Sequence, residues 1–193
     1  IPPKLRGENP ESFVEKIKTF VQKAVLNSSI ENILFISSSS VYGEEAITIT
    51  ETTPEKPETL SGKELLETEH FLQQQTAFKT TILRFGGLIG GNRNPAKSLA
   101  GKSNIATPQA PINLIHQDDC IGIITAIIKQ NYWNQKLNAA APFHPTRKEY
   151  YTFKAQVLGL DLPQFEENNA SGKTIDSSKL ITALNYHFIH SAL

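Results

Sequence analysis

Hydrophobic residues near the start of the chain recur at helical spacing, and further along they gather in short continuous runs. The helical spacing predicts an amphipathic helix over about residues 10–27. Ile33–Ile36 and Thr80–Phe85 are apolar on both faces, as buried parallel strands are, and a helix over about residues 61–75 lies between them. A strand, a helix and a strand in that order predict two parallel neighbours in an α/β sheet.

The second half of the chain continues this alternation. Gly86–Gly91 predicts a flexible turn after the second strand, and further strands are expected at 112–116 and 136–139. Three more helices are expected: one capped by Asp118 or Asp119 and running to Lys129, one opened by the capping box Thr146–Glu149 and ended by Gly159, and one from Asp176 through Leu184.

Charge and composition narrow the class of protein. Nineteen Lys and Arg balance nineteen Asp and Glu, and no segment gathers cations, so we expect no nucleic-acid partner. The longest apolar runs fall short of the ~20 residues that span a bilayer, so we expect no membrane partner. The single cysteine, Cys120, cannot form an internal disulfide, and no basic-then-apolar leader precedes the first helix. A cytoplasmic protein is therefore expected.

Glycine-rich segments do not match the known phosphate-binding loops. Gly86–Gly91 lacks the i, i+2, i+5 glycine spacing of the dinucleotide fingerprint. Gly101-Lys102-Ser103 and Gly172-Lys173-Thr174 lack the first glycine of a Walker A loop. We interpret both as ordinary loops.

Residue types that bind metals are clustered in the segment His116–Cys120. This segment joins a strand to a helix, so its aspartates are expected to cap the helix. Cys120 is expected to face apolar neighbours, which argues against a reactive thiol. The sequence therefore predicts no metal site.

A run of serines, Ser37–Ser40, follows the first predicted strand directly. Ligands of open α/β sheets bind outside the carboxyl ends of the strands, so these hydroxyls could donate to a bound carbonyl or alkoxide. Serines that only satisfy the backbone of a turn are an equally good interpretation of the sequence.

Several segments together resemble one family in their order and spacing over nearly the whole chain. They are Ile36–Gly43, Glu51–Pro54, Ser61–Glu69, Leu83–Gly87, His116–Asp119 and Asn138. They are similar to the second half of an atypical extended short-chain dehydrogenase/reductase of the NAD-dependent epimerase/dehydratase family, YeeZ-like branch.

The resemblance implies the C-terminal part of a Rossmann-type parallel sheet with a smaller substrate lobe. Residues 1–88 with 118–145 would form a partial NAD(P)-binding domain, and 89–117 with 146–193 a small substrate-binding lobe. The chain contains no methionine and begins at Ile1, so we expect an upstream segment that carries the glycine-rich loop. Without that segment, the strand edge along residues 33–36 has lost its neighbour, and we expect it to be covered by another copy of the chain in a homo-oligomer or by a segment outside this sequence.

The resemblance also assigns roles to residues. Ser38 would be catalytic, polarising the reacting oxygen. The nicotinamide side would comprise Pro2, Pro3, Ser37, Phe85, Gly86 and Gly87. The substrate would meet Ser39, Ser40, Tyr42, Asn92 and Arg93.

The family's general acid/base pair does not carry over. Members use a tyrosine and a lysine four residues later, whose ammonium lowers the pKa of the tyrosine. Aligned on Glu69, these positions hold Ser61 and Leu65. Ser61 and Glu64 instead fit a capping box, and Lys63 is displaced around the helix by about 200°.

Two functions follow from the resemblance. The intact protein would be an NAD(P)-dependent oxidoreductase or epimerase-like enzyme acting on a small polar or nucleotide-sugar-like substrate, with NAD or NADP as cofactor. The alternative is a non-catalytic dinucleotide-binding sensor or scaffold. By itself, this chain is expected to bind no cofactor.

Overall fold

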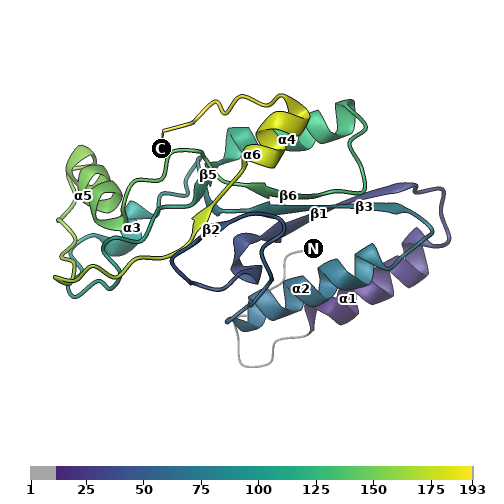
Figure 1. Cartoon of the computed structure of the whole chain (residues 1–193), viewed down its shortest axis with the longest axis horizontal. Helices are drawn as coiled ribbons and strands as arrows, with labels where there is room; N and C mark the ends of the chain where they lie inside the picture. The colour runs from purple at the N-terminus through teal and green to yellow at the C-terminus, as the bar shows by residue number, and fades with distance from the viewer. Residues whose placement is uncertain (1–11, 193) are drawn as a thin grey trace.

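A three-stranded parallel sheet organises the computed structural model, which describes residues 12–192 (Figure 1). Its strands are β1 (Asn32–Ser38), β3 (Lys79–Phe85) and β6 (Lys136–Ala139), in the order β1-β3-β6. Both neighbouring pairs are parallel, with Ser38 opposite Phe85 and Phe85 opposite Ala139. The predicted α/β class and the three sheet strands are confirmed.

Helices cover both faces of this sheet. α1 (Phe13–Phe20) and α2 (Leu60–Gln73) lie on one face, and α4 (Gln117–Lys129) and α6 (Ser178–Leu184) on the other (Figure 1). Ile82 and Leu83 are consecutive in β3 and pack into opposite layers, as the alternation of a strand requires.

Short elements complete the fold at the end of the sheet where β1 and β3 finish. β4 (Gly87–Ile89) pairs in parallel with β5 (Leu114–His116), and β2 (Thr48–Ile49) with β7 (Thr174–Ile175). The remaining elements are the π-helical turn η1 (Val21–Val25), the 3-10 turn η2 (Ser39–Val41), α3 (Ala96–Leu99) and α5 (Arg147–Val157).

The predicted helix starts are only partly right. The Thr146–Glu149 capping box is present, and Gly159 follows α5 with φ of 63°. The predicted Ser61 capping box is wrong, because the Thr59 side chain caps α2 by accepting from the N–H of Gly62. His116, not Asp118 or Asp119, caps α4. α6 has Ser177 at its N-cap position, but Asp176 does accept the N–H of Ser178.

The glycine-rich segment after β3 is not simply a turn. Gly87–Ile89 forms β4, and the left-handed turn begins only at Gly90, with φ of 110°. A Cβ at Gly86 would lie 2.5 Å from the carbonyl oxygen of Asn113, so glycine is what lets this backbone approach the segment leading into β5.

β1 ends the sheet within residues 12–192, in line with the edge that the resemblance implies. That this edge is covered by another copy or by a further segment stays a prediction. No helix in that part of the chain is long and apolar enough to cross a membrane. The proposed division into two domains also stays a prediction, although Leu180 and Leu184 pack in the core of the sheet rather than in a separate lobe.

Candidate functional site

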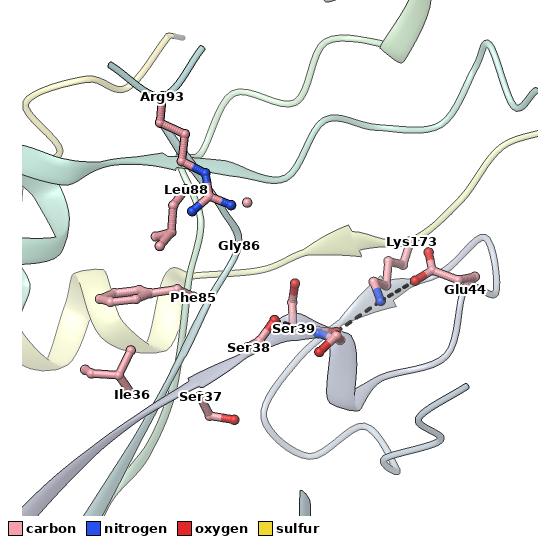
Figure 2. A pocket seen from close by; sticks show the side chains of 12 residues that line it. Ile36, Ser37, Ser38, Ser39, Glu44, Phe85, Gly86, Leu88, Arg93 and Lys173 are labelled. Atoms are coloured by element: carbon pink, nitrogen blue, oxygen red, sulfur yellow. Dashed lines mark hydrogen bonds and ion pairs between the residues drawn. The ribbon is translucent and has the colours of Figure 1, made fainter. Parts of the chain in front are cut away.

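A hollow of about 390 Å³ opens at the carboxyl ends of β1 and β3 (Figure 2). This size falls within the range of ligand pockets, about 300–1,000 Å³, and the position is where open α/β sheets bind ligands. Its lining comprises Ile36, Ser37, Ser38, Ser39, Ser40, Glu44, Phe85, Gly86, Gly87, Leu88, Arg93 and Lys173. The fold therefore brings most of the residues predicted from the sequence to one place.

The serine turn, Ser37–Ser40, forms one wall, and its hydroxyls have different tasks. Ser38 Oγ accepts the N–H of Ser40 at 3.1 Å, which caps the η2 turn and leaves its own O–H available to donate. Ser37 Oγ donates to Glu69 Oε1, so its O–H is already engaged in a hydrogen bond in the protein interior. Ser38 therefore supports the turn, as one interpretation of the serine run expects, and its role as a donor to a ligand oxygen stays a prediction.

Two cations face the hollow from segments far from the serines in sequence. The Arg93 side chain lies opposite the serine turn (Figure 2) and makes no hydrogen bond or ion pair with residues 12–192. Lys173, which is largely buried, donates to the carbonyl oxygens of Ser39 at 3.0 Å and Tyr42 at 3.2 Å and to Glu44 at 2.8 Å. Arg93 can therefore bind an anionic ligand group, whereas Lys173 holds the serine turn in place.

Neither Lys173 nor Glu44 was predicted from the sequence to line the candidate site. Lys173 lies in one of the two segments interpreted as ordinary loops, and 134 residues separate it from Ser39. β2, which follows the serine turn, pairs with β7, which follows Lys173, and this pairing brings Lys173 near the serines. Neither two-residue strand leaves a periodic signal in the sequence.

An apolar wall continues the hollow on its other side. Ile36, Phe85 and Leu88 also line an adjoining hollow of about 320 Å³ that reaches Cys120. Burial raises the pKa of the Cys120 thiol to about 11, and the charge of Asp119 adds to this. Cys120 is therefore a poor nucleophile at neutral pH, in agreement with the expectation from the sequence.

Behind the serine turn lies a buried charge network centred on Arg84. Its guanidinium donates to both oxygens of Glu69, to Glu55 at 2.6 Å and to the hydroxyl of Tyr42 at 2.6 Å. Arg84 and Glu69 are both fully buried, and Ser37 joins the network through Glu69. The network therefore ties the end of β1 to α2 and β3.

The pKa of Glu55 reflects this environment. Burial alone would raise it, but hydrogen bonds from Lys136 and Arg84 outweigh burial and hold the pKa at about 2. Glu55 is therefore ionised at neutral pH and neutralises part of the charge that Arg84 and Lys136 bring into the interior.

Some residues assigned from the sequence lie away from the hollow. Tyr42 is fully buried and its hydroxyl donates to Asn138 Oδ1 at 2.9 Å, so its side chain belongs to the charge network. Asn92 is exposed and is not part of the lining. Pro2 and Pro3 lie outside the described residues.

The positions of the family's tyrosine and lysine also lie outside this lining. Leu65 is buried in the core between α2 and the sheet, and Ser61 contacts the capping residue Thr59, with 3.2 Å between their hydroxyl oxygens. Lys63 is exposed and does not line the hollow. Within the described residues, the titratable groups of the hollow are instead Glu44, Arg93 and Lys173.

Several solved structures with this fold contain a bound dinucleotide. The UDP-glucuronic acid 4-epimerase of Bacillus cereus, in complex with UDP-glucuronic acid and NAD, superposes with a TM-score of 0.77 at 19% identity, covering 96% of this chain and 66% of the epimerase. The human epimerase family protein SDR39U1 with NADPH superposes with a TM-score of 0.74 at 16% identity, covering 97% of this chain and 74% of the human one. At these identities the likeness establishes the Rossmann-type fold.

Sequence similarity to a curated protein is closer. No family model matches the chain. Protein YeeZ of Escherichia coli (strain K12) is 35% identical over 190 residues, which cover 97% of this chain and 69% of YeeZ. The chain belongs to the NAD-dependent epimerase/dehydratase family, in its YeeZ-like branch.

Proposed function

We propose that the protein is an NAD(P)-dependent oxidoreductase or epimerase-like enzyme that acts on a small polar or nucleotide-sugar-like substrate in this hollow. The observation that carries the proposal is the placement of two groups around one apolar-walled hollow at the strand ends: the donating hydroxyl of Ser38, and the guanidinium of Arg93, which has no partner among residues 12–192. The complex of the similar Bacillus cereus epimerase with NAD and UDP-glucuronic acid supports this choice of ligands.

The lining fits the nicotinamide end of a dinucleotide. Ile36, Phe85 and Leu88 offer an apolar surface for a flat ring, and Gly86 and Gly87 place no side chain between that surface and the serine turn. In this proposal Phe85, Gly86, Gly87 and the Ser37 backbone border the cofactor. The bound dinucleotide would supply a hydride acceptor or donor.

The substrate would occupy the side of the hollow nearer Arg93. Ser38 donates its O–H to the reacting oxygen, which favours developing negative charge there. Arg93 pairs with an anionic group such as a phosphate or carboxylate, for which its planar fork is suited. Ser39 and Ser40 border the same space and offer further hydroxyls.

One observation favours the alternative, a dinucleotide-binding sensor or scaffold. Ser61 and Leu65 stand where the family has its tyrosine and lysine, and neither side chain lines the hollow. In this alternative the hollow binds ligands without turnover.

Binding and turnover measurements distinguish the two. The protein, expressed from its complete gene, is titrated with NAD⁺ and NADP⁺ by calorimetry. It is then assayed with a panel of UDP-sugars for nicotinamide reduction and, because an epimerase regenerates its cofactor in every cycle, for the epimeric sugar product. For the enzyme we expect Ser38→Ala to lower kcat by about 10²-fold or more with little change in cofactor affinity. The exposed serine variant Ser103→Ala is the matched control and should behave as wild type.

The possible results of these measurements distinguish the enzyme from the sensor or scaffold. Cofactor binding without turnover on any substrate would favour the sensor. Failure of the complete protein to bind either dinucleotide would contradict both functions.

A further inference from the structure

Three metal-ligating side chains from separate segments converge at the start of α4. His116 ends β5, Asp118 lies in the first turn of α4, and His190 comes from the C-terminal segment that follows α6. One ligand atom from each residue lies within 4.8 Å of the other two. We propose that His116, Asp118 and His190 form a binding site for a divalent transition-metal ion of the zinc class.

The spacing suits tetrahedral coordination. Asp118 Oδ2 lies 3.2 Å from His116 Nδ1 and 3.0 Å from His190 Nε2. Metal–ligand bonds of about 2.0–2.2 Å at tetrahedral angles separate neighbouring ligand atoms by roughly 3.3–3.6 Å. The ligand atoms of the two histidines lie no more than 4.8 Å apart, so the rings would close on the ion by at most about 1.5 Å. Imidazole with carboxylate is a ligand set that zinc, nickel and copper accept.

The protein positions the distant histidine without help from the metal. Asp119 is fully buried and its carboxylate accepts the N–H groups of Ile189 at 2.7 Å and His190 at 3.1 Å, and the hydroxyl of Tyr186 at 3.0 Å. This clamp holds the C-terminal segment against α4. Because Asp119 is engaged in this way, Asp118 is the carboxylate that faces the two histidine rings.

The His116 ring is confined on its other side by the glycine turn. A Cβ at Gly90 would lie 2.7 Å from His116 Nε2, so the ring packs directly on that backbone. The rings of His116 and His190 lie 3.8 Å apart between centroids. Both rings therefore border the same small space beside Asp118.

The space between these three side chains is open to solvent, and three protein ligands would leave one coordination position of the ion free. The Asp118 side chain is 55% exposed and that of His190 37%, so the site opens to solvent. In this structure His116 Nδ1 accepts the N–H of Asp118 at 3.2 Å, and His190 pairs with Asp118. A metal would replace these two contacts, and three protein ligands leave a fourth position for water.

Such a site would clip the C-terminal segment to the start of α4. It does not depend on the proposed enzymatic function. The sequence alone favoured a capping role for this segment because nothing in it indicates that His190, 72 residues from Asp118, lies beside it.

Titration with zinc chloride tests the proposal. Full-length protein without a histidine tag, stripped with a chelator, should bind one zinc ion per site by calorimetry. His190→Ala and Asp118→Asn should each weaken zinc binding by at least about tenfold, because even outer-shell partners of metal ligands contribute 10–100-fold. Zinc at about a hundredfold excess over Kd should raise the Tm of the wild type by roughly 5–10 °C.

His187→Ala is the matched control, since His187 is an exposed histidine three residues before His190. It should bind zinc as the wild type does. Equal zinc affinity in wild type and His190→Ala, or an equal loss in His187→Ala, would overturn the proposal. If a variant unfolds, cobalt(II) absorption of the wild type decides: intense tetrahedral bands support the site, and their absence contradicts it.

Discussion

Arg84→Met is expected to lower the free energy of unfolding by about 3–5 kcal/mol, because it leaves the fully buried carboxylate of Glu69 without its cation. The Tm should fall by roughly 6–20 °C for a chain of this size. Urea denaturation followed by circular dichroism measures the first quantity and a thermal scan the second.

Two further variants show whether the buried charge causes the loss. Arg147→Met removes a partly exposed arginine that contacts Thr107 at 3.1 Å, and should cost about 1 kcal/mol or less. Adding Glu69→Leu to Arg84→Met removes the stranded carboxylate and should restore most of the stability. A loss in Arg84→Met no larger than that in Arg147→Met would show that the network is not an important source of stability.

Gly62→Ala is expected to disturb both stability and the hollow. A Cβ at this position would lie 2.4 Å from the carbonyl oxygen of Ser40, so the first turn of α2 and the serine turn must separate. Overpacking of this kind costs about 1–3 kcal/mol, and the better helix propensity of alanine offsets up to about 1 kcal/mol of it. Because displacements near 1 Å in a site can cost about 10²-fold in rate, we also expect at least about tenfold weaker ligand binding.

Gly43→Ala is the matched control for this change. Its Cβ would meet its nearest neighbours, in Lys56, at 3.6 Å, which is ordinary van der Waals contact. We expect stability and ligand affinity close to those of the wild type. Wild-type affinity in Gly62→Ala, measured by calorimetry, would contradict the close coupling between α2 and the serine turn.

Long periodic segments were predictable from the sequence. Phe35 and Ile82 lie in strands whose apolar runs are continuous, and the helix between them buries Leu65 and Leu72 at helical spacing. The Thr146 capping box was predictable too, because its two hydrogen bonds depend only on residues three apart. Local sequence patterns therefore sufficed to predict most strands of the sheet and most of the helices that cover it.

Features that depend on distant contacts were not predictable. The backbone of Gly87 pairs as a strand only because Leu114 lies beside it, whereas its own sequence indicates a turn. His116 caps α4 because its ring packs against Gly90, although two aspartates nearby are better capping residues by propensity. Lys173 reaches the serine turn across more than a hundred residues of sequence. These are the contacts that complete the candidate site.

A crystal structure of the complete protein with NAD⁺ and UDP-glucuronic acid tests most directly whether this hollow is the ligand site. We predict density for the nicotinamide beside Phe85 and Gly86, and for an anionic group of the sugar nucleotide within hydrogen-bond distance of Arg93, with an acceptor oxygen close to the Ser38 hydroxyl. Ligand density elsewhere on the protein, with the hollow empty at saturating ligand, would contradict the proposal.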